Sequence, residues 1–189
     1  MITGQHVTLS AIDTNDLPQL LEWRNQLRKY FRQFTEISEA QQKEWYEGLK
    51  DDWSTIMFAI HEKVKEYDVN PKGELLGACG LTYIDWKNRT SELSCYIGRH
   101  YADDKYTPDV LRLLIDYGFG ELGLHKLWAE VYEFNTGNKT ILEQMGFHTD
   151  GTLRDNLWRE GRWWNSTVYS LLYPEWLTAI SYDIIGADE

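Results

Sequence analysis

The sequence predicts one α/β domain of the α+β kind, in which about four helices cover a mixed, mostly antiparallel sheet of seven strands. The 189 residues fit a single hydrophobic core, because domains most often contain about 100–150 residues. Aromatic residues make up 14% of the chain, and their apolar surface offsets the entropy that keeps polar chains unfolded. Strand-like runs are interspersed with apolar residues at helical spacing, so residues 1–189 are expected to form one domain.

The chain is predicted to begin with a strand over residues 5–12, followed by a helix. Asp13 and Thr14 can cap this helix. Its apolar positions recur near the 3.6-residue period at Leu17, Leu20, Leu21, Leu27 and Phe31. Ser38 and Gln41 have the spacing of a capping box, which would open a second helix.

Three further strands are predicted to form an antiparallel meander, over residues 54–61, 74–84 and 91–98. Asn70-Pro-Lys-Gly73 has the proline and glycine positions of a four-residue turn, and a second turn follows residue 84. Cys79 and Cys95 would then lie opposite one another. In a domain of this size they predict buried free thiols.

A long helix is predicted after the meander. Thr107, Pro108 and Asp109 place a cap residue, a first-turn proline and an acid in order. The helix should therefore begin at Pro108, and it should end near Gly123.

The last part of the chain predicts a parallel strand and a hairpin. A strand over residues 126–133 would pair in parallel with the strand 91–98, because the helix between them forms a crossover. A short helix over 138–145 follows, and residues 147–156 and 163–172 form the hairpin.

Charge and composition exclude several classes of partner. A net charge of −11 repels phosphate backbones and anionic membrane surfaces. No run approaches the ~20 apolar residues of a membrane span, and the first six residues lack the pattern of a secretory signal, so we expect a cytoplasmic protein. The five His are scattered, which gives a metal site no support.

Several motifs, in this order and spacing, resemble the GNAT superfamily of acyl-CoA-dependent N-acyltransferases, in particular the branch of the ribosomal-protein-alanine and spermidine acetyltransferases. They are Glu92-Leu-Ser-Cys-Tyr-Ile-Gly98, the stretch 111–127, Asn135, Gly146-Phe147, Gly151-Thr-Leu-Arg154 and Gly161-Arg162. The resemblance covers residues 5–172. It implies the GNAT fold and an acetyl-CoA-dependent N-acetyltransferase that acts on a primary amine, of a small molecule or a peptide N-terminus, by direct attack on the thioester.

The resemblance also implies where acetyl-CoA binds. In the GNAT fold a turn between the fourth strand and the long helix points backbone N–H groups at the pyrophosphate. The expected coenzyme-binding residues are therefore Tyr96, Ile97 and Gly98 at the strand end, Lys105, Tyr106 and Thr107 before the helix, and Asn135 and Asn138 further on. Loop or helix-cap chemistry explains the two asparagines equally well.

The coenzyme loop departs from the family pattern, which is Gln or Arg, two residues, Gly, one residue, then Gly or Ala. Ala102, Lys105 and Thr107 occupy the three signature positions, and Asp103 and Asp104 add negative charge near the phosphates. Coenzyme A could therefore bind weakly, bind to a rearranged loop or not bind. The last case is the alternative function, a GNAT-fold module that binds a ligand or a partner.

The resemblance places Glu92 where several relatives carry a catalytic base; the alternative for this residue is a solvated carboxylate at a strand edge. His125 is a second candidate base. Leu142 stands where the family often has a tyrosine that protonates the leaving thiolate, and leucine has no proton to donate. The candidates for this acid are therefore Tyr101, Tyr106, Tyr132 and water.

Aromatic residues crowd the predicted acceptor end, and Phe31, Trp158 and Trp163 are the candidates for substrate binding. Ring faces with acids nearby suit a cationic amine, whereas core packing is the alternative role for the same side chains. A peptide N-terminus, a polyamine and an amino sugar all fit this description. A monomer or a homodimer is expected.

Overall fold

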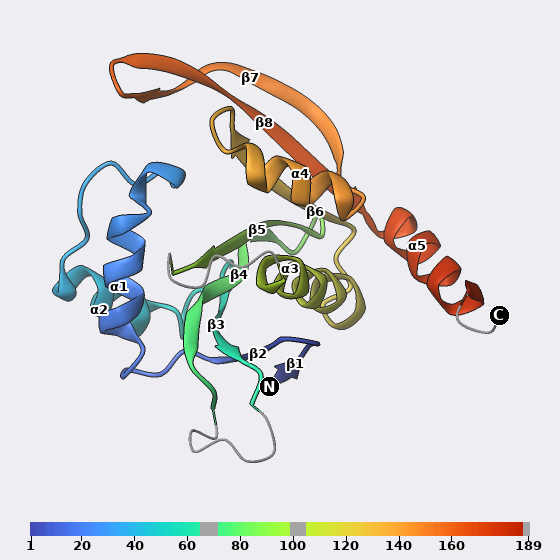
Figure 1. The fold of residues 1–189 in the computed structure, drawn as a ribbon, viewed down its shortest axis with the longest axis horizontal. Coiled ribbons are helices and arrows are strands. Elements are labelled where there is room, and N and C mark those ends of the chain that lie inside the picture. The colour runs from blue at the N-terminus through green and yellow to red at the C-terminus, as the bar shows by residue number, and fades with distance from the viewer. Residues whose placement is uncertain (65–71, 99–104, 187–189) are drawn as a thin grey trace.

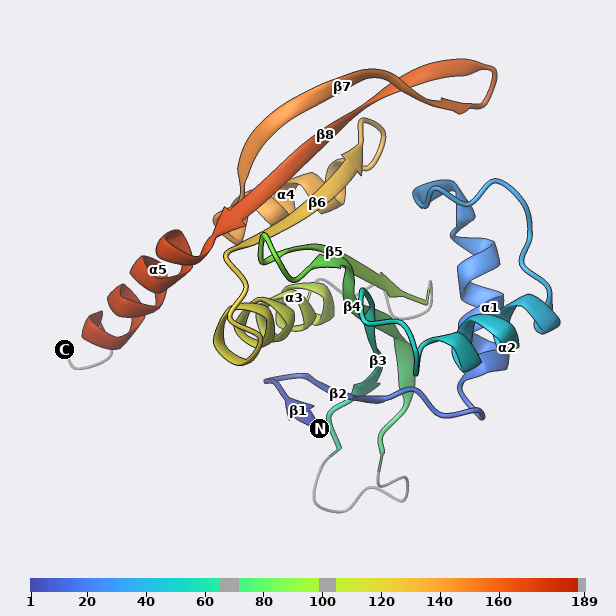
Figure 2. The same ribbon diagram turned by 180° about the vertical axis from the view of Figure 1, so that it is seen from behind.

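The computed structural model describes residues 1–64, 72–98 and 105–186, with residues 180–186 as backbone only. Within them, eight strands form one sheet in the order β1-β2-β3-β4-β5-β6-β8-β7 (Figures 1 and 2). The strands are β1 Ile2–Thr3, β2 Val7–Ala11, β3 Ile56–Glu62, β4 Leu75–Asp85, β5 Thr90–Ile97, β6 Lys126–Tyr132, β7 His148–Arg159 and β8 Arg162–Leu172. The α-helices are α1 Leu17–Gln26, α2 Glu39–Gly48, α3 Tyr106–Asp116, α4 Thr136–Gln144 and α5 Tyr173–Gly186.

The sheet is mixed, as the sequence predicts. β2 to β5 pair antiparallel in succession, which confirms the meander. β5 and β6 are parallel, and β6, β8 and β7 are again antiparallel. The described sheet has eight strands rather than seven, because the two-residue β1 pairs with β2.

Apolar residues cover both faces of the central strands. One cluster joins α3 to β2 through β6 and includes Val110, Leu114 and Leu127. The other joins α1 to the opposite face through Leu20 and Trp23. Among the described residues, no helix combines the length and the apolarity that crossing a bilayer requires.

The first helix is shorter than its apolar spacing predicts. It ends at Gln26, a 3₁₀ turn covers Arg28–Tyr30, and Phe31 is extended with φ −117° and ψ 167°. Long-range contacts override the helical pattern here, because Arg159 binds the Phe31 carbonyl and the Phe31 ring packs against that of Tyr96. The predicted cap was also wrong, since the Asp13 carboxylate accepts the Asn15 N–H in a turn before the helix.

Other local predictions are confirmed. Ser38 accepts the Gln41 N–H and Gln41 accepts the Ser38 N–H, which is the capping box that opens α2. The final hairpin reverses at Glu160 and Gly161, both with positive φ. The predicted turn Asn70–Gly73 lies partly outside the described residues. The described chain has a fifth helix, α5, which sequence patterning missed.

The long helix begins at Tyr106, two residues before the predicted start, and neither Lys105 nor Thr107 provides a side-chain cap. Asp109 instead serves a distant segment. Its side chain is 4% exposed, and the carboxylate accepts the backbone N–H groups of Gln5, His6 and Val7 at 3.1, 2.7 and 3.1 Å. The helix thereby fixes the turn between β1 and β2.

Cys79 and Cys95 are register partners on β4 and β5, and both are free thiols, as predicted; Cys79 is buried, whereas Cys95 is only partly buried. Side chains opposite each other in a sheet have Cβ atoms about 4.5–5.5 Å apart, which is longer than a disulfide prefers. Thiol titration of the unfolded, unreduced protein should therefore find both thiols. Finding none would contradict this prediction.

Candidate active site

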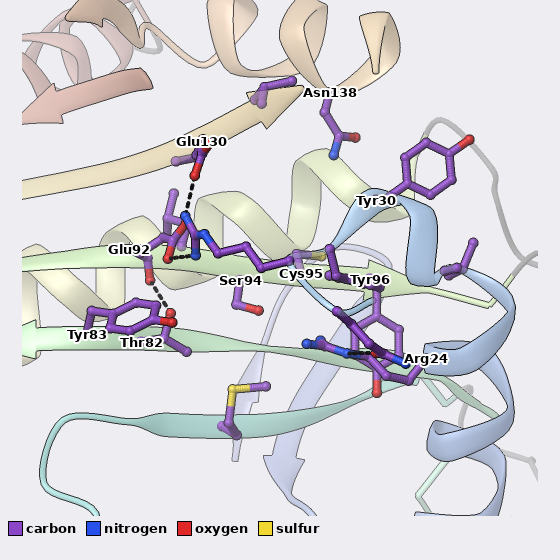
Figure 3. A pocket seen from close by; sticks show the side chains of 18 of the residues that line it. Arg24, Tyr30, Thr82, Tyr83, Glu92, Ser94, Cys95, Tyr96, Glu130 and Asn138 are labelled. Carbon is purple, nitrogen blue, oxygen red and sulfur yellow. Dashed lines mark hydrogen bonds and ion pairs between the residues drawn. The ribbon is translucent and has the colours of Figure 1, made fainter. Parts of the chain in front are cut away.

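The parallel strands β5 and β6 separate after a short pairing. In the described chain, Thr90, Ser91 and Glu92 pair with Lys126, Leu127 and Trp128, and the pairing stops there. β5 continues to pair with β4 up to Ile97, so its opposite edge from Leu93 onward has no strand neighbour. A cavity of about 830 Å³ occupies this region, lined by both strands, α1, α2, α3, α4 and the segment after the 3₁₀ turn (Figure 3).

Two buried carboxylates lie where the strands separate. Glu92 on β5 and Glu130 on β6 have side chains that are 10% and 9% exposed. Arg32 bridges them, because its Nη1 and Nη2 each donate to Glu92 at 2.8 Å and Nη2 also donates to Glu130 at 2.5 Å. Glu92 is therefore not the solvated edge carboxylate that was its alternative interpretation.

The ion pairs change the acidity of these groups. Hydrogen bonding to Glu92, partly opposed by burial, raises the pKa of Arg32. Burial alone would raise the pKa of Glu130, but hydrogen bonds from Ser166 and Arg32 outweigh it and hold that pKa below its usual value. Both groups are consequently charged at neutral pH.

An aromatic wall closes the cavity on the α1 side. The Phe31 and Tyr96 rings meet edge to face at 5.7 Å, and the Arg24 guanidinium lies 3.9 Å from the Phe31 ring centre. Burial lowers the pKa of Arg24 and raises that of Tyr96. The Tyr96 hydroxyl donates to the Leu20 carbonyl at 3.4 Å, so its side chain anchors β5 to α1.

The structure brings seven of the predicted site residues to this cavity: Phe31, Glu92, Tyr96, Ile97, Thr107, Asn135 and Asn138. Ser94 also lines it, on the face of β5 that carries Glu92 and Tyr96. Asn135 stands at the N-cap of α4 without a side-chain cap bond. The predicted loop residues Ala102, Asp103 and Asp104 lie outside the described residues.

Five predicted residues are not among the described residues that line the cavity: Gly98, Lys105, Tyr106, Trp158 and Trp163. The Gly98 N–H donates to Leu76, and a Cβ there would lie 2.4 Å from the Trp23 ring. The Tyr106 hydroxyl donates to Glu62 at 2.8 Å. Trp158 and Trp163 pack on each other near the hairpin tip and are 53% and 56% exposed. Aromatic content alone did not reveal that they lie away from the cavity.

The positions of the candidate residues narrow the choice of a proton donor for the leaving thiolate. Leu142, which has no proton to donate, lines the cavity. Tyr132 lines it as well, and burial and the neighbouring Glu130 raise the pKa of its hydroxyl. Tyr101 lies outside the described residues. His125 does not line the cavity in the described chain, and no three metal-ligating side chains are grouped there.

Sequence reasoning missed Arg32 and Glu130. Glu130 carried a weak signal, because it is a charged residue within the apolar run of β6. Arg32 carried none, since it follows a segment whose spacing favours a helix.

The chain is similar to known acetyltransferases. Residues 6–148 match the acetyltransferase (GNAT) domain family. An uncharacterized N-acetyltransferase, p20, of Bacillus licheniformis is 29% identical over 91% of this chain and 96% of its own, and a putative ribosomal N-acetyltransferase, YdaF, of Bacillus subtilis is 27% identical over 92% and 94%. The spermidine N-acetyltransferase of Vibrio cholerae, solved in complex with CoA and spermine, superposes with a TM-score of 0.82 at 21% identity, over 90% of this chain and 98% of that one. The chain belongs to the GNAT acetyltransferase family.

Proposed function

We propose that this protein is an N-acetyltransferase that transfers the acetyl group of acetyl-CoA to a primary amine of a small molecule or a peptide terminus. The observation that carries this proposal is the separation of β5 from β6 beside two buried carboxylates. Backbone N–H groups on the open edge of β5 can hold the thioester carbonyl and stabilise the oxyanion that forms there. The same cavity has charged groups within reach of the acceptor amine.

Acetyl-CoA would enter from the side of α3 and α4. Thr107, Asn135 and Asn138 line that part of the cavity, and the N-terminus of α3 carries the partial positive charge that favours a pyrophosphate. Ile141 and Leu142 give it an apolar wall. The relative solved with CoA supports this use of the shared fold.

The reaction is a direct acyl transfer. The amine nitrogen attacks the carbonyl carbon, a C–N bond forms, and the electron pair of the C=O bond moves to the oxygen held by β5. When the tetrahedral intermediate collapses, the C–S bond breaks. Glu92 takes the amine proton directly or through water, and water or the Tyr132 hydroxyl protonates the thiolate.

A cationic acceptor agrees with the charges. Glu92 and Glu130 lie at the strand junction, the place where β5 and β6 separate. Their carboxylates and the net charge of −11 favour an amine that arrives protonated. The similar proteins named as a putative ribosomal N-acetyltransferase and a spermidine N-acetyltransferase, the latter solved with spermine, support an amine acceptor. The protein is proposed to work as a monomer or a homodimer in the cytoplasm.

Thermal denaturation with acetyl-CoA tests the proposal. At a concentration about a hundred times the dissociation constant, the ligand should stabilise the fold by ~2.7 kcal/mol. For a chain of this size that raises the melting temperature by about 5–11 °C. No shift with millimolar acetyl-CoA would overturn the proposal and favour a module without coenzyme. Release of CoA thiol on adding amines provides the catalytic readout.

A further inference from the structure

The cavity already contains a cation from the protein itself. Arg32 makes a bidentate ion pair with Glu92 and a further contact with Glu130. Its side chain is 47% exposed, whereas the two carboxylates are 10% and 9% exposed. The anions are therefore part of the buried sheet, and the cation reaches them from a surface segment.

Glu130 is held in place independently of Arg32. Its Oε1 accepts from the Asn156 side chain at 2.7 Å and from the Ser166 hydroxyl at 2.6 Å, and Ser166 is fully buried on β8. Only Oε2 faces the guanidinium. If Arg32 left, Glu130 would still present this oxygen to another cation.

The Arg32 side chain can leave without moving its backbone. Arg159 binds the carbonyl oxygens of Phe31 and Gln33, on either side of it, at 3.3 and 2.9 Å. The Tyr83 ring lies 5.7 Å from the Arg32 guanidinium and gives a displaced cation a face to rest on. Tyr83 takes a left-handed φ of +50°, beside an irregularity in β4, and Figure 3 shows it in the same part of the pocket as Glu92.

We propose that Arg32 occupies, in the free protein, the position that the acceptor's ammonium group takes before acetylation, and that the acceptor displaces it. This inference rests on the proposed function and deepens it. When the ammonium group replaces the guanidinium, the two carboxylates still share one positive charge, so the net charge of the site does not change. A neutral acceptor would leave both buried carboxylates without a countercharge, which is costly. Displacement also frees the Glu92 oxygens to accept the amine proton.

The test compares binding of 1,4-diaminobutane to the wild-type protein and to Arg32→Gln, without acetyl-CoA. The variant should melt at a lower temperature because two buried carboxylates lose their countercharge, and the diamine should restore it. Calorimetric titration should show about tenfold tighter binding to the variant, which corresponds to Arg32 filling the site about 90% of the time. Neutral 1,4-butanediol should have no effect on either protein.

Arg28→Gln is the matched control. Arg28 lies four residues earlier, pairs with Glu36 at 2.8 Å on the surface and does not line the cavity. Its loss should leave diamine binding unchanged. If Arg32→Gln does not fold, Arg32→Lys replaces it. The lysine ammonium lacks the guanidinium fork, so about threefold tighter diamine binding is expected.

Diamine binding to the Arg32 variants that is equal to or weaker than binding to wild type would overturn the inference, because Arg32 would then be a fixed part of the acceptor site. Equal stabilisation by 1,4-butanediol would overturn it too. The proposed function fails separately, through the absence of acetyl-CoA binding to the wild-type protein.

Discussion

Glu92→Gln should lower turnover by about 10²–10⁴-fold while the melting temperature changes little. The amide keeps the shape of the side chain and can still accept a hydrogen bond from Arg32, but it cannot take a proton from the amine. Arg32 also retains Glu130 as a partner, so the fold should tolerate the change. Steady-state release of CoA thiol at saturating acetyl-CoA measures the effect.

Glu133→Gln provides the control for the same chemical change. Glu133 follows β6 directly, is exposed and accepts the Asn165 N–H at 3.3 Å without lining the cavity. Its turnover should equal that of the wild type. If Glu92→Gln also retained full turnover at neutral pH, water or another side chain would have to be the base. A loss of folding would assign Glu92 a structural role instead.

Asp109→Asn should have the largest effect on stability. The carboxylate accepts three consecutive backbone N–H groups and the Arg112 guanidinium, whereas an asparagine would direct its own N–H₂ group at some of these donors. Leaving buried donors unpaired should cost about 2–4 kcal/mol. The melting temperature should then fall by about 4–16 °C.

The pH dependence of this difference identifies its cause. Burial would raise the pKa of Asp109, but hydrogen bonds from the β1–β2 turn and Arg112 hold it below its ordinary value near 3.8. On acidification, Asp109 therefore takes up its proton at a higher pH in the unfolded chain than in the folded protein. The stabilisation that the carboxylate provides is present above its unfolded pKa and is lost as the pH falls through its lower folded pKa. The wild type and Asp109→Asn should converge in stability at low pH. A constant difference down to acidic pH would contradict this account.

Arg112→Gln separates the ion pair from the backbone contacts. The Arg112 side chain is 55% exposed, and such pairs contribute little because solvent screens them. We expect a small change in melting temperature. A fall as large as that of Asp109→Asn would mean that the arginine, rather than the N–H groups, carries the effect.

The sequence predicted those parts of the fold that depend on local patterns. Ser38 and Gln41 satisfy each other within one helical turn, and the hairpin at Gly161 needs only neighbouring residues. The end of α1 and the role of Asp109 depend instead on contacts more than 100 residues away along the chain. A helical period near Phe31 therefore gave way to tertiary contacts.

The site divides in the same way. Glu92 was located because it lies in a motif with fixed spacing, and the structure places it at the strand junction. Arg32 approaches it from 60 residues away, and Glu130 joins the cluster through a sheet pairing that spans the crossover. No pattern in a single sequence connects these residues. For Trp158 and Trp163 the sequence suggested too much: their residue type suggested a substrate role, but their position on an exposed hairpin does not support it.

Cys95 lies close to the open edge of β5, and its thiol is a nucleophile that could react with the thioester in place of the acceptor amine. It lines the cavity next to the edge on which the thioester is proposed to lie. An ionised sulfur there would compete with the amine for the acetyl group and leave a dead-end acyl-cysteine. Burial raises the pKa of Cys95 to about 12, so the thiol is neutral at pH 7. If the proposed acetyl transfer takes place at this edge, burial of Cys95 in the sheet would suppress self-acylation and keep the acetyl group available for the amine nitrogen.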